Sequence, residues 1–185
     1  MTNPVDNDFL PEDYTPPQKE NKYLNKFPQG ETRFRILSKP IIGWLDWDDK
    51  KPCRYRMEER PEKSVDPNGF RHFWAAVIWN YTLSKIQIME ITQATIQKKI
   101  AILSQDTDWG NPLNYDIKIT RVGESMQDTK YDVTAIPHKP VAPDVVDMCN
   151  KTPINLAALF EGEDPFSEAK EVAAQKGKVK MPAGM

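Results

Sequence analysis

Apolar and polar residues alternate through most of the middle of the chain. In residues 32–37, the apolar Phe34 and Ile36 alternate with Arg33 and Arg35. A period of two is typical of a β-strand with one buried face, because successive side chains point to opposite sides of the sheet. The pattern therefore predicts a strand whose two arginines face outward.

The same alternation predicts further strands, and one segment changes to a helical period. After a break at residues 38–40, the sequence IIGWLDW continues the extended pattern as one long, coiled strand. In residues 92–104, Ile96, Ile100 and Leu103 recur at the spacing of an amphipathic helix. In chain order, the predicted elements are strand 32–47, strand 73–79, strand 85–91, helix 92–104, strand 115–121 and strand 131–136.

This order favours a mainly β fold. A five-stranded OB-fold Greek-key barrel has one helix between strands 3 and 4, which is the order predicted here. An SH3-like barrel is the alternative, but it lacks a helix at that position. Beyond the last strand, residues 143–151 and 152–162 predict short C-terminal helices that pack on the barrel, the second with Gly162 at its end.

Composition divides the chain into three parts. Residues 1–21 predict a disordered acidic N-terminal arm, residues 22–160 the OB-fold domain with its helical extension, and residues 161–185 a flexible C-terminal tail. The N-terminus has neither the basic start nor the apolar run of a secretory signal. A cytoplasmic location without membrane association is therefore expected, and a disulfide between the two distant cysteines is not.

Charge is distributed unevenly along the chain. The net charge is −2, yet residues 22–121 hold 17 Lys and Arg against 12 Asp and Glu. Residues 1–21 hold one against five, and residues 122–175 hold four against ten. A basic middle fits a partner that carries phosphates, and chance variation of surface charge is the alternative.

Aromatic residues and cations are interleaved between residues 44 and 81. Single-stranded nucleic acid needs a flat apolar surface for its bases and positive charge for its phosphates. Alternation in strand 73–79 puts Trp74 on the opposite side from Phe73 and Trp79, so at least one tryptophan should point out of the barrel. The alternative is that these rings belong to the core. The candidate nucleic-acid-binding residues are Arg33, Arg35, Trp44, Trp47, Lys50, Lys51, Arg54, Tyr55, Arg56, Arg71 and Trp74.

No catalytic signature of a hydrolase, zinc protease, P-loop or dinucleotide-binding enzyme occurs in the sequence. A zinc site built from Cys53, His72, His138 and Cys149 is disfavoured, because no two of these residues are closer than 11 positions. The acidic clusters fall in predicted turns, where Asp is favoured for local hydrogen bonding. We therefore expect no catalysis, no metal and no cofactor, with a metal-dependent nuclease as the weaker alternative.

Six segments between residues 23 and 137 are informative through their order and spacing. They are YLNKFPQGETRFRIL, GWLDW, KPCRYR, KIQIMEITQATIQKKIAIL, DTDWGNPLNYDIKITRVGE and YDVTAIP. Together they resemble the small single-stranded DNA-binding proteins of tailed bacteriophages, relatives in role of the phage helix-destabilising proteins. The resemblance implies an OB-fold and a role in phage DNA replication and recombination in the host cytoplasm, where the protein coats exposed strands.

The resemblance also bears on individual residues and partners. It implies that Trp44, Trp47, Lys51, Arg54 and Trp74 lie in the DNA-binding cleft. It further implies that an acidic C-terminal tail recruits phage or host replication proteins. This chain departs from that pattern, because three lysines follow the acids and no acidic tip closes the tail.

The sequence thus predicts a non-catalytic protein that binds single-stranded DNA with little sequence preference. We expect a monomer or weak self-association along the strand. An OB-fold protein-interaction module that binds no nucleic acid is the alternative. The choice of DNA over RNA comes from the resemblance alone.

Overall fold

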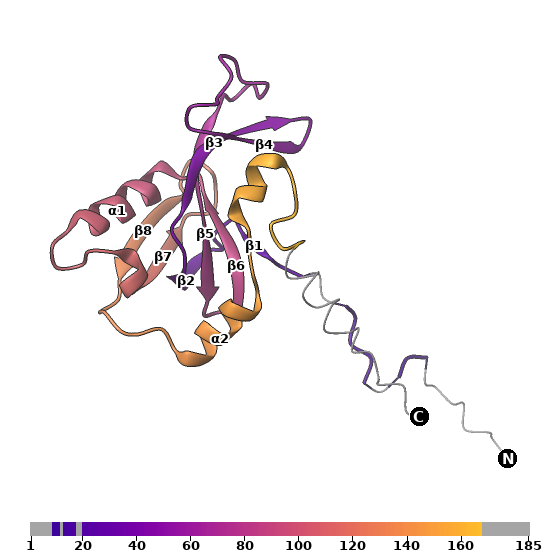
Figure 1. The fold of residues 1–185 in the computed structure, drawn as a ribbon, viewed down its shortest axis with the longest axis vertical. Coiled ribbons are helices and arrows are strands. Elements are labelled where there is room, and N and C mark those ends of the chain that lie inside the picture. Colours follow the sequence, from indigo (N-terminus) through magenta and orange to yellow (C-terminus); the bar gives the residue numbers. More distant parts are fainter. Residues whose placement is uncertain (1–8, 12, 18–19, 168–185) are drawn as a thin grey trace, which may run out of the picture.

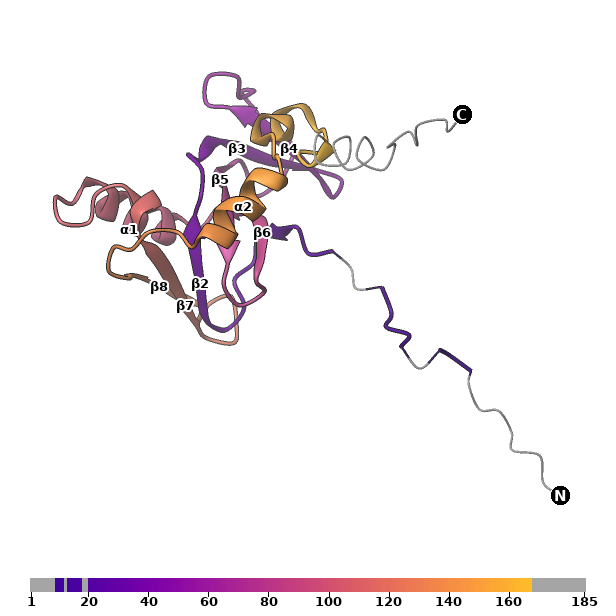
Figure 2. The same ribbon diagram turned by 60° about the horizontal axis from the view of Figure 1, so that its bottom comes forward.

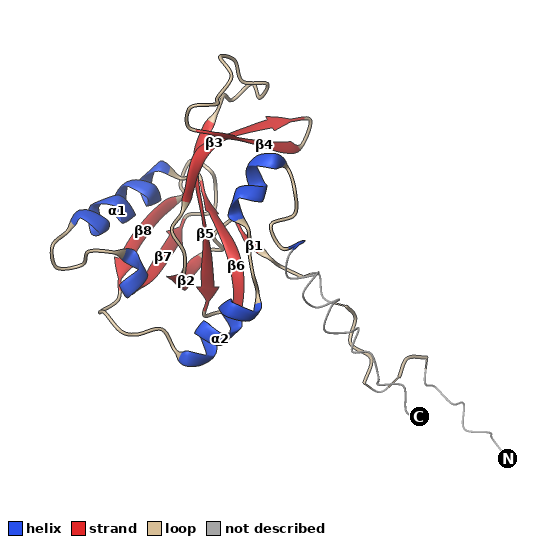
Figure 3. Cartoon of the chain, in the orientation of Figure 1, coloured by secondary structure: helices blue, strands red, loops and turns tan. Residues whose placement is uncertain are grey.

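The computed structural model describes residues 9–11, 13–17 and 20–167, and eight strands in this part of the chain join into one sheet (Figures 1 and 3). The strands are β1 (Tyr23–Leu24), β2 (Gly30–Ile36), β3 (Ile41–Asp48), β4 (Lys51–Arg56), β5 (Arg71–Asn80), β6 (Lys85–Ile91), β7 (Asp116–Val122) and β8 (Lys130–Ala135). The helices are α1 (Ala94–Gln105), α2 (Pro143–Lys151) and the 3₁₀ segments η1 (Pro112–Asn114) and η2 (Leu156–Glu161). The predicted mainly β class is confirmed. None of the helices in these described ranges is long and apolar enough to cross a membrane.

The sheet is open and has more strands than the five predicted. Its order is β1-β6-β5-β2-β7-β8, and β3 pairs with both β4 and β5. Among the described residues no backbone pairing joins β6 to β8, so the strands do not close a barrel by hydrogen bonds. The extra strands arise because the long first strand divides into β2 and β3, because β4 forms in a segment without periodicity, and because β1 adds a short parallel edge to β6.

Alternate residues of β5 contribute to two separate cores. Ala76 and Ile78 pack in the larger core, with apolar residues of β2, β6, β7 and α1. Phe73 and Ala75 point to the other side and pack with Leu159 in the smaller core. Both faces of β5 are therefore buried over much of its length.

The C-terminal segment covers this second face. The sequence predicted an α-helix over 152–162, but the structure has only the six-residue 3₁₀ segment η2, which ends at Gly162 in the left-handed conformation. Figure 2 shows η2 against the β3–β4 hairpin. The Phe160 ring lies 6.0 Å from the Phe73 ring, at a point where Gly43 has no side chain to block it. Of the predicted tail at 161–185, residues 168–185 lie outside the described part of the chain, whereas Phe166 is buried in the smaller core. Of the predicted arm at 1–21, residues 1–8, 12, 18 and 19 also lie outside it.

A buried ion-pair network joins β2 to β7. Arg35 is 1% exposed, so the prediction that it faces outward was wrong. Its Nε donates to Asp116 Oδ1 at 2.7 Å, and its Nη2 donates to the Lys139 carbonyl at 2.7 Å. Arg33 Nη2 donates to Asp116 Oδ2 at 2.6 Å and Tyr81 donates its hydroxyl to Oδ1 at 3.0 Å. Alternation could not predict this burial, because the anion comes from a strand 81 residues away.

Burial alone would raise the pKa of the Asp116 carboxyl, but hydrogen bonds from Arg33, Arg35 and Tyr81 outweigh it and lower that pKa below its ordinary value. A group whose folded pKa is depressed stabilises the protein fully above its unfolded pKa, about 4 for Asp, and loses that contribution as the pH falls through the folded pKa. The network is therefore intact at neutral pH and fails only in acid.

Replacing Asp116 with Asn should lower the free energy of unfolding by about 3–5 kcal/mol, because it leaves Arg35 buried without its anion. Chemical denaturation at neutral pH measures this change. Asp132→Asn is the matched control, since this Asp also pairs with a cation, Lys99, but its side chain is 68% exposed. The control should cost less than about 1 kcal/mol. Equal midpoints for the two variants would contradict a stabilising role for the network.

Candidate nucleic-acid interface

The pairing of β3 with two neighbours brings four rings to one side of the sheet. Trp44 pairs with Tyr55 of β4 and with His72 of β5, and Ile42 pairs with Trp74. Residues paired across a ladder lie side by side on the same face. We call this set, together with Phe70, the aromatic face: Trp44, Tyr55, Phe70, His72 and Trp74. The side chains of Trp44, Tyr55 and Trp74 are all half-buried, so they are neither sealed in a core nor fully solvated.

Two hydrogen bonds fix the His72 ring and, through it, Trp74. His72 Nδ1 lies 3.0 Å from the Gly43 carbonyl oxygen, and Trp74 Nε1 lies 3.2 Å from His72 Nε2. The carbonyl can only accept and the indole N–H can only donate, so Nδ1 carries the proton and Nε2 accepts. The Trp44 ring packs on this imidazole at 5.2 Å between centroids. The neutral His72 ring therefore orients two tryptophans at once.

The loop between β4 and β5 folds back onto the aromatic face. Its Arg60 guanidinium lies 4.5 Å from the Trp44 ring centroid and 4.9 Å from that of Phe70. Phe70 in turn packs edge-on against Tyr55 at 6.4 Å. Arginine over an aromatic ring is a favourable cation–π arrangement. A positive charge is thus held directly beside the rings.

Asp46 fastens this loop to β3. It is 2% exposed, and its carboxylate accepts hydrogen bonds from the Ser64 hydroxyl at 2.6 Å and from the backbone N–H groups of Trp47, Val65 and Asp66 at 2.9–3.1 Å. Burial acts to raise the pKa of Asp46, but these four hydrogen bonds outweigh it and lower that pKa below its ordinary value. The side chain stays ionised and keeps the loop in place at neutral pH.

Some of the predicted site residues lie on the opposite side of the same hairpin. Arg54 and Arg56 alternate with Tyr55 in β4, and Trp47 alternates with Asp46 in β3, so these three side chains point away from the aromatic face. Arg54 Nε donates to Glu90 at 2.7 Å, and its side chain is only 14% exposed. Arg71, in register with Leu45, is also on that side and is exposed.

Arg56 is likewise engaged on that side. Its Nη1 lies 3.4 Å from Glu59 and 3.3 Å from Glu161, and its guanidinium lies 4.7 Å from the Phe160 ring centroid. These carboxylates raise the pKa of the Arg56 guanidinium, and the main cause is the hydrogen bond that the guanidinium donates to Glu161. The structure therefore separates Arg54 and Arg56 from Trp44 and Tyr55, which the sequence had grouped with them.

Arg33 and Arg35 are remote from the aromatic face along β5. Arg35 is in register with Trp79, whereas the face is built on His72. Trp79 and His72 are seven residues apart in β5, and an extended strand of that length spans about 23 Å. Neither arginine therefore belongs to the surface formed by Trp44, Tyr55 and Trp74.

The lysines of the β3–β4 turn are free of ionic partners. Lys50 and Lys51 are exposed and form no ion pair with any residue in the described part of the chain. Lys51 is in register with Asp48. Asp48 alternates onto the same side of β3 as Asp46 and Trp44, so Lys51 lies on the side of the aromatic face. The turn that carries them is tight, with positive φ at Asp49 and Lys50.

Three members of the interface were not among the predicted site residues, namely Arg60, Phe70 and His72. Arg60 and Phe70 fall in the predicted aromatic and basic segment, but their placement depends on how Asp46 folds the loop. His72 was weighed only as a zinc ligand, and both of its ring nitrogens instead face partners within the sheet. Within the described residues no three His, Cys, Asp or Glu side chains gather as a metal site.

Replacing Asp46 with Ala should release the loop at residues 57–70, because the loop loses its hydrogen bonds to a charged acceptor. We expect trypsin to cleave after Lys63 about tenfold faster or more, since proteolysis of a locally opened segment follows its opening equilibrium. Mass spectrometry of the early fragments measures the rate. Asp48→Ala, an exposed Asp of the same strand, is the control and should cleave at the wild-type rate. Identical rates in both variants would show that Asp46 does not hold the loop.

Comparison of the chain with family models, with curated proteins and with solved structures found no match. The geometry of the aromatic face and its cations therefore indicates the function.

Proposed function

We propose that the protein binds single-stranded DNA without catalysis and with little sequence preference. The observation that carries this proposal is the row formed by Tyr55, Trp44 and His72 across three strands, with Arg60 over the Trp44 ring. Bases stack on half-exposed rings whatever their sequence, because every base has an aromatic face. If a base stacks on Trp44 in place of Arg60, the displaced Arg60 guanidinium stays close enough to pair with the phosphate of the same nucleotide.

The arrangement of strands supports an OB-type relationship. β2 and β3 together pair with β5, β5 pairs with β6, β7 pairs with β2, and β8 pairs with β7, with α1 between β6 and β7 in the chain. An OB-fold has this order of connections. We therefore propose an OB-fold variant that is open between β6 and β8 and carries the β3–β4 hairpin as an insertion. OB-folds bind oligonucleotides with the loop that this hairpin would replace.

The biological role follows from the resemblance to tailed-phage proteins. On this proposal the protein coats and protects exposed strands during phage DNA replication and recombination in the host cytoplasm. Recruitment of replication proteins by the C-terminal tail belongs to the same proposal, and it concerns residues outside the described part of the chain.

Oligo-dT should bind the protein at about 50 mM salt and quench tryptophan fluorescence. Trp44→Ala should weaken binding by about 1–3 kcal/mol, because one stacking surface is removed. Trp47→Ala is the matched control: this tryptophan lies three positions away but on the other side of the hairpin, and the variant should bind as the wild type does. A wild-type protein that binds no oligonucleotide but captures a partner protein without salt dependence would overturn the proposal in favour of a protein-interaction module.

Lys51→Ala should reduce the dependence of affinity on salt. Removing the cation that neutralises one phosphate should lower the slope of log K against log salt by about 0.7 for a single strand. Titrations of oligo-dT at several salt concentrations measure this slope. Lys130→Ala on β8 removes a cation that is exposed but remote in the sheet order from β3, and its slope should match the wild type. A slope unchanged by Lys51→Ala would place the phosphates elsewhere.

A further inference from the structure

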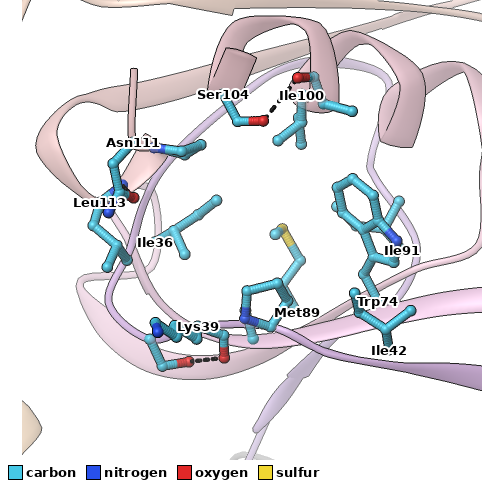
Figure 4. A pocket seen from close by; sticks show the side chains of 15 residues that line it. Ile36, Lys39, Ile42, Trp74, Met89, Ile91, Ile100, Ser104, Asn111 and Leu113 are labelled. Carbon is cyan, nitrogen blue, oxygen red and sulfur yellow. Dashed lines mark hydrogen bonds between the residues drawn. The ribbon is translucent and has the colours of Figure 1, made fainter. Parts of the chain in front are cut away.

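A cavity of about 300 Å³ lies between α1, the β2–β3 break and the floor formed by β5 and β6 (Figure 4). Its walls are mainly apolar and include Ile36, Trp74, Met89 and Ile100. Five of the lining residues are exposed, so the cavity opens to solvent: Lys39, Pro40, Ile42, Ser104 and Asn111. Small-molecule sites begin at about this volume and share this character, apolar walls with a few polar groups.

The cavity is continuous with the aromatic face through Trp74. This residue is in register with Ile42, which lies beside Trp44 on the aromatic side of β3, and it also forms one wall of the cavity. Its indole N–H is already bound by His72, so the ring is held in position. A strand whose bases stack along Trp44 therefore passes the cavity mouth at Trp74.

The polar groups of the cavity suit the edge of one base. Asn111 Oδ1 accepts a hydrogen bond from the Leu113 N–H at 3.0 Å, which leaves its side-chain NH₂ to donate. Ser104 donates its hydroxyl to the Ala101 carbonyl at 2.7 Å, which leaves its lone pairs to accept. Both residues lie across the cavity from Trp74 (Figure 4). A pyrimidine such as thymine carries both a carbonyl acceptor and an N–H donor on one edge, and its methyl group suits apolar walls.

Charge distinguishes the mouth from the interior. Of the described residues that line the cavity, Lys39 alone is charged, and it is exposed at the rim. It forms no ion pair with any described residue. The site thus offers a cation for the phosphate outside and a nearly neutral slot for the ring inside.

We propose that this cavity receives one unstacked pyrimidine base of the bound strand. The inference depends on the proposed function, since it assigns one nucleotide of the same strand. The volume holds a single ring with its substituents rather than a stack of bases. Binding in the cavity turns one base out of the stack, which the sequence-tolerant aromatic face does not require.

The test uses the full chain and an oligo-dT in which thymine is replaced by 5-bromouracil. Irradiation of the wild-type complex should crosslink the base to Met89, which lines the cavity and is absent from the aromatic face. Mass spectrometry of the digested adduct locates the crosslink. Ala101→Phe, which fills the cavity from α1, should remove the Met89 adduct and weaken oligo-dT binding by about tenfold, which is roughly what one bound base contributes. Ile102→Phe, on the same helix but 58% exposed and not lining the cavity, should retain both.

The outcomes separate the two proposals. Failure of the wild-type protein to bind oligo-dT would overturn the proposed function and this inference with it. Binding at the wild-type affinity by Ala101→Phe, with crosslinks confined to Trp44 and Tyr55, would overturn the base pocket alone. The wild-type crosslink needs no variant, so the inference stays testable if Ala101→Phe does not fold.

Discussion

The structure depends on one strand, β5, pairing along a single edge with two strands in succession. β2 occupies the half that ends at Asn80, and β3 occupies the half that begins at Arg71. The exchange occurs at Val77, where the Ser38 hydroxyl oxygen accepts the Val77 N–H at 2.9 Å and the Leu37 N–H donates to the Val77 carbonyl at 2.8 Å. Buried backbone groups are costly to leave unpaired, so these two bonds allow the chain to leave one partner strand and continue as another. β2 then pairs with β7, while β3 continues into the hairpin with β4.

That division decides which rings are exposed. Where β2 runs, the inner side of β5 meets the larger core, and Ala76 and Ile78 are covered. Where β3 runs, the other side meets the C-terminal segment through Phe160 and Leu159, which fill the second core. On the side that carries Trp44 and Tyr55, the Asp46-bound loop lies above the rings. On the proposed function, this half-buried aromatic surface between the two cores is where the bases stack.

The sequence predicted those parts of the fold that depend on local periodicity. The hairpin of β5 and β6, the helix α1 and the strands β7 and β8 all occur near their predicted positions. Prediction failed where a distant residue decides the outcome. Arg35 is buried because Asp116 lies opposite it in β7, and the loop positions Arg60 because Asp46 binds Ser64. β4 was missed because KPCRYR contains a proline and one aromatic residue among its charges and has no apolar stripe. For the same reason, Arg54 was grouped with Tyr55 although adjacent strand residues face opposite ways.

The separation of cations into paired and unpaired sets shapes how a strand would bind on the proposed function. Arg54 and Arg56 are held by Glu90, Glu59 and Glu161, so a phosphate that recruited them would have to break existing ion pairs. Lys50 and Lys51 can bind a phosphate without breaking an ion pair. Arg60 would give up its cation–π contacts with Trp44 and Phe70 to bind one. Few cations then gain new partners, so counterion release contributes less than the number of basic residues suggests. Stacking must supply the larger share of the affinity, which is why the orientation of Trp44 and Trp74 by one neutral histidine matters more than the net charge of the segment.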